Sequence, residues 1–122
     1  MMESKEELEK EFKWLADNIG LPEGEIRTDH EKTKKYIQDT WKIEVMVKPW
    51  KYRPECGEED IYNRDGYMYF VIDLDENDQR INCVSEDLRV FQSEEEALMN
   101  GLIEGMAFVD LYKKNKTQAE GH

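Results

Sequence analysis

SEEEALMNGLIEGMAFVDLY, residues 93–112, is the longest and most hydrophobic periodic stretch of the chain. Ser93 and Glu96 form a Ser-x-x-Glu capping box, in which the Ser hydroxyl accepts a hydrogen bond from a backbone amide of the first turn. The glutamates after Ser93 lie where the helix dipole favours negative charge. Apolar residues then recur at helical spacing as far as Tyr112. The sequence therefore predicts a long helix that the other elements must cover.

Two glycines, Gly101 and Gly105, stand four residues apart inside this predicted helix. An interior Gly costs a helix about 1 kcal/mol relative to Ala. Close packing against a neighbouring element would offset that cost, and we expect the neighbour to be a sheet. A helix–helix dimer seam is the alternative. A membrane seam of this kind is excluded, because Glu104 and Asp110 interrupt the apolar row.

The N-terminal half predicts two more helices. The first covers residues 5–18 and ends at Gly20, with Pro22 preventing its continuation. The second covers residues 29–41 and begins at a capping box in residues 28–31. The apolar stripe of the first helix is formed by Leu8, Phe12, Leu15 and Ile19, and the apolar side of the second by Tyr36, Ile37, Thr40 and Trp41.

Three strands are predicted between these helices and the last one, in residues 43–48, 66–74 and 80–84. The first alternates with period two, and we expect Ile43, Val45 and Val47 to face the core. Both alternate rows of the second strand are apolar, and we expect the more apolar row to face the helices. That row consists of Met68, Phe70, Ile72 and Leu74, whereas the opposite row consists of Tyr67, Tyr69, Val71 and Asp73. A short fourth piece is expected around Leu88, Val90 and Phe91.

The predicted order is α-α-β-β-β(-β)-α. It indicates an α+β fold, with an antiparallel sheet of three to four strands and helices packed on one face. Residues 1–114 are expected to form a single domain and residues 115–122 a disordered tail. The predicted loop of residues 51–65 connects the first two strands. No segment reaches the roughly 20 apolar residues of a membrane span, and no N-terminal signal segment is visible.

The charge of the chain is strongly acidic and unevenly placed. The net charge is −12, and residues 52–112 carry 4 basic and 16 acidic side chains, which is −12 for this segment alone. A protein that binds phosphate backbones needs the opposite sign, so direct nucleic-acid binding is not expected. A solvated acidic surface is the simplest interpretation.

No catalytic or metal-binding pattern stands out, so we expect no enzyme activity, no metal and no cofactor. The chain has two His, and His30 has no nucleophile or orienting partner nearby in sequence. Residues 73–78 begin like a calcium loop, but Asp78 replaces the required Gly and Val84 replaces the bidentate Glu. An acidic hairpin turn is the expectation there, with a weak ion site as the alternative. We expect Cys56 and Cys83 to be free thiols in a reducing cytoplasm. The alternative is a single disulfide between them.

One surface is a candidate for partner binding. If the helices cover one face of the sheet, the other face would carry Met46, Trp50, Tyr67 and Tyr69. Aromatic residues and Met are enriched at protein interfaces. The alternative is that residues 51–65 or a helix fold over this face and bury it.

Two stretches resemble small uncharacterised proteins of prophage and mobile-element regions. The first is residues 36–45, YIQDTWKIEV. The second is residues 91–104, which follow the pattern F-x-S-x-E-E-A-L-x-x-G-L-x-E. They cover about a fifth of the chain. The resemblance implies a small intracellular accessory protein and transfers no functional residues.

The sequence thus predicts a non-enzymatic, cytoplasmic protein-protein interaction module that uses an aromatic sheet face. Its partner is either another protein or a second copy of the chain, forming a homodimer. The alternative function is an acidic mimic of nucleic acid that occupies a DNA-binding protein. The two differ in salt dependence, because a charge mimic loses affinity steeply as ionic strength rises.

Overall fold

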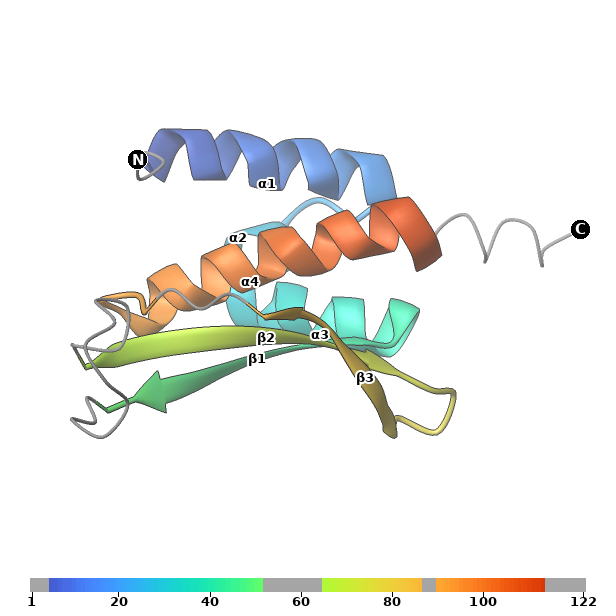
Figure 1. Ribbon diagram of the computed structural model, residues 1–122. Helices are drawn as coiled ribbons and strands as arrows, with labels where there is room; N and C mark the ends of the chain where they lie inside the picture. The colour runs from blue at the N-terminus through green and yellow to red at the C-terminus, as the bar shows by residue number, and fades with distance from the viewer. Residues whose placement is uncertain (1–4, 52–64, 87–89, 114–122) are drawn as a thin grey trace, which may run out of the picture.

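A computed structural model describes residues 5–51, 65–86 and 90–113, and it has an α+β fold (Figure 1). A three-stranded antiparallel sheet has the order β1-β2-β3. Helix α4 lies on the sheet, and helix α1 lies on α4 on the side away from the sheet (Figure 1). The elements are α1 (Lys5–Ile19), α2 (Glu25–Thr28), α3 (His30–Trp41), β1 (Ile43–Trp50), β2 (Gly66–Leu74), β3 (Arg80–Glu86), α4 (Glu94–Phe108) and the π-helical turn η3 (Val109–Lys113).

Helix α4 is the centre of the packing. It contacts β1, β2, α1 and α3, so its buried residues surround most of its circumference. These residues are Ala97, Leu98, Gly101, Leu102, Ile103, Gly105 and Met106. Its N-terminus is capped as predicted, because Ser93 Oγ accepts from the Glu96 amide at 3.1 Å. The high apolar content of this segment therefore reflects burial on several sides.

The two glycines of α4 allow it to lie close to the sheet. A Cβ atom on Gly101 would come within 2.7 Å of Val45 Cγ1 and 3.2 Å of Tyr69 Cβ, and one on Gly105 would come within 3.0 Å of Val45 Cγ2. Real Cβ atoms essentially never show contacts under 3.0 Å. Close packing on a sheet, as predicted, is thus confirmed as the reason for this pair.

The face assignment of β2 predicted from the sequence is wrong. In the β1–β2 ladder, Val45 pairs with Val71 and Val47 pairs with Tyr69, and these residues lie on the side of α4. The row that contacts the helices is therefore Tyr67, Tyr69 and Val71, and the row on the outward face is Met68, Phe70, Ile72 and Leu74. The prediction chose the more apolar row as the inward one. The Tyr hydroxyl makes the row of Tyr67 and Tyr69 less hydrophobic by sequence, although the Tyr69 ring packs beside Gly101.

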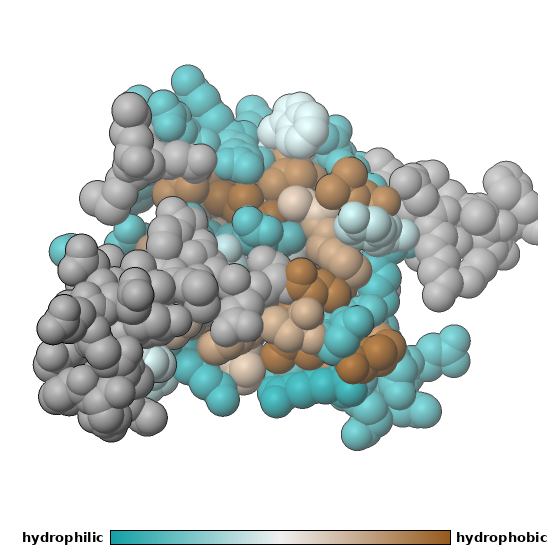
Figure 2. All heavy atoms as spheres, viewed as in Figure 1, coloured by the Kyte–Doolittle hydropathy of each residue, from teal (hydrophilic) through white to brown (hydrophobic). Residues whose placement is uncertain are grey.

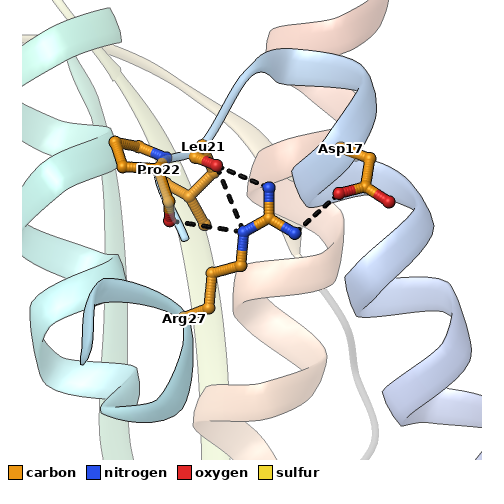
Figure 3. A network of polar contacts seen from close by, with 4 residues as sticks. All are labelled: Asp17, Leu21, Pro22 and Arg27. Atoms are coloured by element: carbon orange, nitrogen blue, oxygen red, sulfur yellow. Dashed lines mark hydrogen bonds and ion pairs between the residues drawn. The ribbon is translucent and has the colours of Figure 1, made fainter. Parts of the chain in front are cut away.

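The connection from α1 to α3 is fixed by Arg27 (Figure 3). Gly20 adopts a positive φ of 77°, and the Leu21 amide donates to the Ala16 carbonyl at 2.9 Å, which is the predicted end of α1. Arg27 then donates twice to the Leu21 carbonyl and once to that of Pro22, and its Nη1 lies 2.6 Å from Asp17 Oδ1. Its side chain is 16% exposed.

The turn that precedes α3 differs from the sequence prediction in two ways. Residues 25–28 form the short helix α2, which was not predicted. The N-cap of α3 is Asp29, whose side chain accepts from the Glu31 amide at 3.0 Å. Thr33 is completely buried, and its hydroxyl donates to the carbonyls of Ile26 and Asp29. Thr33, in α3, is therefore hydrogen-bonded to α2 and to the N-cap of its own helix.

The edge of β2 that does not pair with β1 is paired with β3 and with the segment before α4. β3 pairs with β2 through two register shifts, which lie between Val71 and Ile72 and between Asp73 and Leu74. Farther along the same edge, Phe91 makes two backbone hydrogen bonds with Tyr67, of 2.8 and 2.9 Å. The expected fourth piece is thus a single bridge in the described part of the chain.

The described helices include none that is long and apolar enough to cross a bilayer. The predicted tail of residues 115–122, most of the predicted loop of residues 51–65, Leu88 and Cys56 lie outside the described residues.

Candidate partner-binding surface

The titratable side chains of the described segments do not gather into a metal site. No group of three or more His, Cys, Asp or Glu residues there could hold an ion. The His30 ring packs 5.6 Å from the Phe12 ring, centroid to centroid, between α3 and α1. Cys83 is exposed on β3.

The acidic turn of residues 73–78 is built from structural contacts. Asp75 Oδ1 accepts from the amides of Asn77 and Gln79, at 2.8 and 2.9 Å. Asp78, at a positive φ of 63°, pairs with Lys42 at 2.9 Å, and Asp73 pairs with Lys113 at 2.6 Å. The carboxylates of these three residues thus neutralise cations or cap amides, as in the acidic hairpin turn that was predicted.

The four residues predicted to bind a partner do not share a face. Tyr67 and Tyr69 lie on the helix side of the sheet, where Tyr69 is only 1% exposed. Met46 lies on the outward face, as predicted, opposite Phe70 in the ladder, and Trp50 lies in the same alternating row of β1. The expectation of one aromatic surface from all four is therefore wrong, for the same reason as the face assignment of β2.

The outward face of the sheet offers little apolar surface. Met68, Ile72 and Leu74 are each no more than 6% exposed, and Met46, Trp50 and Phe70 are half-buried. At its polar end, Arg80 donates to Glu44 at 3.0 Å, and this hydrogen bond and the charge of Glu44 raise the pKa of Arg80 above its ordinary value. The pair crosses β2 and covers part of the face.

A more exposed apolar surface lies where α1 meets the end of α4. Among the described residues, four large apolar side chains are more than half exposed, and three of them belong to α1 or η3. These are Trp14 at 63%, Leu111 at 63% and Tyr112 at 61%, which together we call the helix-end surface. Because α1 and η3 are in contact, the three side chains come from adjoining elements. Brown and pale atoms continue from α1 to the end of α4 (Figure 2).

The helix-end surface has a fixed support. The ring of Tyr112 lies 4.9 Å from that of Phe108, centroid to centroid, and Phe108 packs against the core. The η3 turn is held to β2 by the ion pair of Lys113 with Asp73, in which both side chains are about four-fifths buried. Exposed side chains on a fixed support lose less conformational entropy on binding.

The sequence contained part of the signal for this surface. Trp14 stands off the apolar stripe of α1, and a large aromatic outside the stripe of an otherwise polar helix face can be recognised without a structure. Tyr112 was counted within the apolar side of the last helix. The change from α-helix to π-helical turn at Val109 alters the direction of the residues after it, and the spacing alone does not reveal that change.

Comparison with protein-family models, curated proteins and solved structures finds no match.

Proposed function

We propose that this protein is a non-enzymatic interaction module of the cytoplasm that binds a protein partner through the helix-end surface of Trp14, Leu111 and Tyr112. The observation that carries the proposal is that, among the described residues, three of the four large exposed apolar side chains belong to two contacting elements. Single exposed apolar residues are common and mean little. Trp and Tyr are among the residues that most often dominate binding energy, and Trp14 and Tyr112 lie on two elements in contact.

The proposal moves the contact from the sheet to the helices. The apolar residues of β1 and β2 on the outward sheet face are buried or half-buried, so a partner would gain less by covering them. Burial of apolar area contributes about 25 cal/mol per Å². The exposed side chains of the helix-end surface therefore provide more binding energy than the outward sheet face.

Photo-crosslinking in the native host tests the proposal. A photoreactive phenylalanine analogue replaces Trp14 or Tyr112 in separate variants, and a third variant carries it in place of Ile81, which is 58% exposed on β3. We expect a discrete adduct with a protein from positions 14 and 112 and none from position 81. Adducts of equal yield from all three positions, or none from positions 14 and 112, would contradict the proposal.

A further inference from the structure

Helix α1 forms the outermost layer of the described structure and is attached through one half of its length. It packs on α4 and η3, on the side of α4 that faces away from the sheet (Figure 1). In residues 5–11 every side chain is exposed except that of Leu8, which is half-buried. The buried residues of α1 all lie in its second half and are Phe12, Leu15, Ala16 and Ile19. The docking of α1 therefore depends on this second half.

The packing among the other elements does not involve α1. Helix α4 packs on β1, β2 and α3, the three strands pair with one another, and α3 packs on β1. Loss of α4 would break most of these contacts, whereas loss of α1 would break none of them. Folded proteins open in cooperative units, and the units with the fewest buried contacts open at the lowest free energy. Helix α1 is thus the helix best placed to open while the rest stays folded.

The connection after α1 contains a pivot and a latch (Figure 3). Gly20 has a positive φ of 77°, and a Cβ atom there would meet nothing within 4 Å, so this residue is free to change conformation. The next residue, Leu21, is held by two hydrogen bonds from Arg27 to its carbonyl. The same guanidinium reaches back across Gly20 to Asp17, at 2.6 Å. Arg27 therefore holds both sides of the pivot.

The position of Asp17 is explained by this latch. A carboxylate in the last turn of a helix opposes the helix dipole, so Asp17 does not favour the helix itself. Its pairing with Arg27 exists only while α1 is docked against the turn that follows it. Asp17 thus stabilises the docked position of α1.

Docking of α1 also assembles the helix-end surface. Trp14 comes from α1, whereas Leu111 and Tyr112 come from η3. These segments lie far apart in the sequence, and they meet because α1 packs on α4 and η3. If α1 swung away about Gly20, Trp14 would leave the surface.

We infer that α1 is a hinged cover that opens about Gly20 while the sheet, α3 and α4 stay folded, and that its docking switches the helix-end surface on. The inference rests on the proposed function and adds the regulation of that site. A partner that contacts both Trp14 and Tyr112 would hold α1 closed, because a ligand shifts a protein toward the conformation that it binds. A condition that releases α1 would in turn weaken the partner.

Hydrogen exchange of the full chain in low concentrations of urea tests the opening. We expect the amides of residues 12–19 to be at least about tenfold less protected than those of β2. Their exchange should also depend less on urea, because opening of α1 exposes less surface than global unfolding does. Equal protection and equal urea dependence in α1 and β2 would mean that α1 opens only with the whole fold, and would overturn the inference.

The latch is tested in the same experiment by Asp17→Lys. This change places a second cation against Arg27 but suits the C-terminal end of the helix, so a loss of protection reports on docking. We expect the protection of residues 12–19 to fall at least about threefold. Glu9→Lys makes the same charge change at an exposed position of α1 and should have no effect. Equal protection in the two variants would overturn the role of the latch.

Forced undocking tests the switch. Ala16 is completely buried, so Ala16→Glu brings a carboxylate into the contact and should release α1. We expect α1 to lose protection, β2 to keep it, and the photo-crosslinked adduct from position 112 to disappear. Lys5→Glu adds negative charge at the exposed start of α1 and should keep both the protection and the adduct.

The other outcomes separate the inference from the proposed function. Loss of protection in both α1 and β2 of Ala16→Glu would show that the fold needs α1, and would overturn the inference. An adduct that persists at position 112 after α1 is released would overturn the switch and leave the proposed function standing on η3. No adduct from position 112 in the chain with α1 docked would contradict the proposed function itself.

Discussion

Lys113 Nζ lies 2.6 Å from Asp73 Oδ1, so one ion pair joins the end of η3 to the end of β2. Lys113→Ala would leave a largely buried carboxylate without its cation, and we expect a loss of about 1–3 kcal/mol in the free energy of unfolding. Urea denaturation measures this loss. Lys35→Ala on the exposed side of α3 is the control, with an expected change within about 0.5 kcal/mol. Equal urea midpoints for the two variants would show that the pair contributes nothing.

The approach of α4 to the sheet predicts that Gly101 cannot be enlarged. Gly101→Ala gains about 1 kcal/mol in helix propensity, but its Cβ would overlap Val45 and lie against Tyr69 near the backbone. We expect a net loss of about 1–2 kcal/mol, a smaller effect for Gly105→Ala, and a larger loss for Gly101→Leu.

A double-mutant cycle with Val45→Ala identifies the cause, because Gly101→Ala should cost less when the Val45 methyls are absent. Light scattering of Gly101→Ala should show the mass of the wild type. Unchanged stability with altered self-association would instead support the helix–helix dimer seam.

Arg27 is predicted to stabilise the α1–α2 turn far more than Arg80 stabilises the sheet. Arg27→Met leaves the Leu21 carbonyl without both guanidinium donors and Asp17 without its cation, at a cost of about 2 kcal/mol. Arg80→Met removes an exposed pair with Glu44 and serves as the control, with an expected effect near zero. Thermal unfolding of the two variants, measured side by side, should give clearly different midpoints. Similar midpoints would contradict the structural role of Arg27.

The buried hydroxyl of Thr33 provides a second pair of matched variants. Thr33→Val keeps the shape but removes the donor to the Ile26 carbonyl, so we expect a loss of about 1–2 kcal/mol. Thr40→Val is the same change at an exposed position of the same helix and should be nearly neutral. Hydrogen exchange in residues 25–33 should accelerate in the first variant alone. Equal protection in both variants would show that the hydroxyl does not join α2 to α3.

The turn at residues 73–78 is predicted not to take up calcium. Asp73 and Asp78 are paired with Lys113 and Lys42, and Asp75 holds two backbone amides, so an ion would have to displace these contacts. Millimolar calcium should leave the amide chemical shifts of residues 73–80 and the thermal midpoint unchanged. Saturable shifts confined to this turn would contradict the prediction.

The order of the elements could be predicted from the sequence because each signal is local. Ser93 caps α4, Gly20 ends α1, and period-two alternation marks β1. The facing of β2 could not be predicted, because both of its rows are apolar and the choice depends on which shapes fit beside Gly101 and Gly105. Tyr69 fits there, although its hydroxyl lowers its hydropathy.

The candidate surface was harder to predict than the fold. Met46 and Trp50 were placed on the outward face correctly, since β1 alternates cleanly. Tyr67 and Tyr69 were assigned to that face because of the same error in β2. Leu111 and Tyr112 lie in the π-helical turn η3, which helical spacing in the sequence does not reveal. The resemblance to prophage proteins stays a prediction.

The central position of α4 has a consequence for synthesis on the ribosome. In the described part of the chain, residues 5–86 contain the three strands and helices α1, α2 and α3, yet α1 and the sheet are joined mainly by packing on either side of α4. Before residues 94–108 have emerged from the ribosome, the stripe of α1 and the inner row of β2 lack their contacts with α4. We therefore expect the chain to remain open to proteases and chaperones until α4 has emerged, and then to fold in one cooperative step.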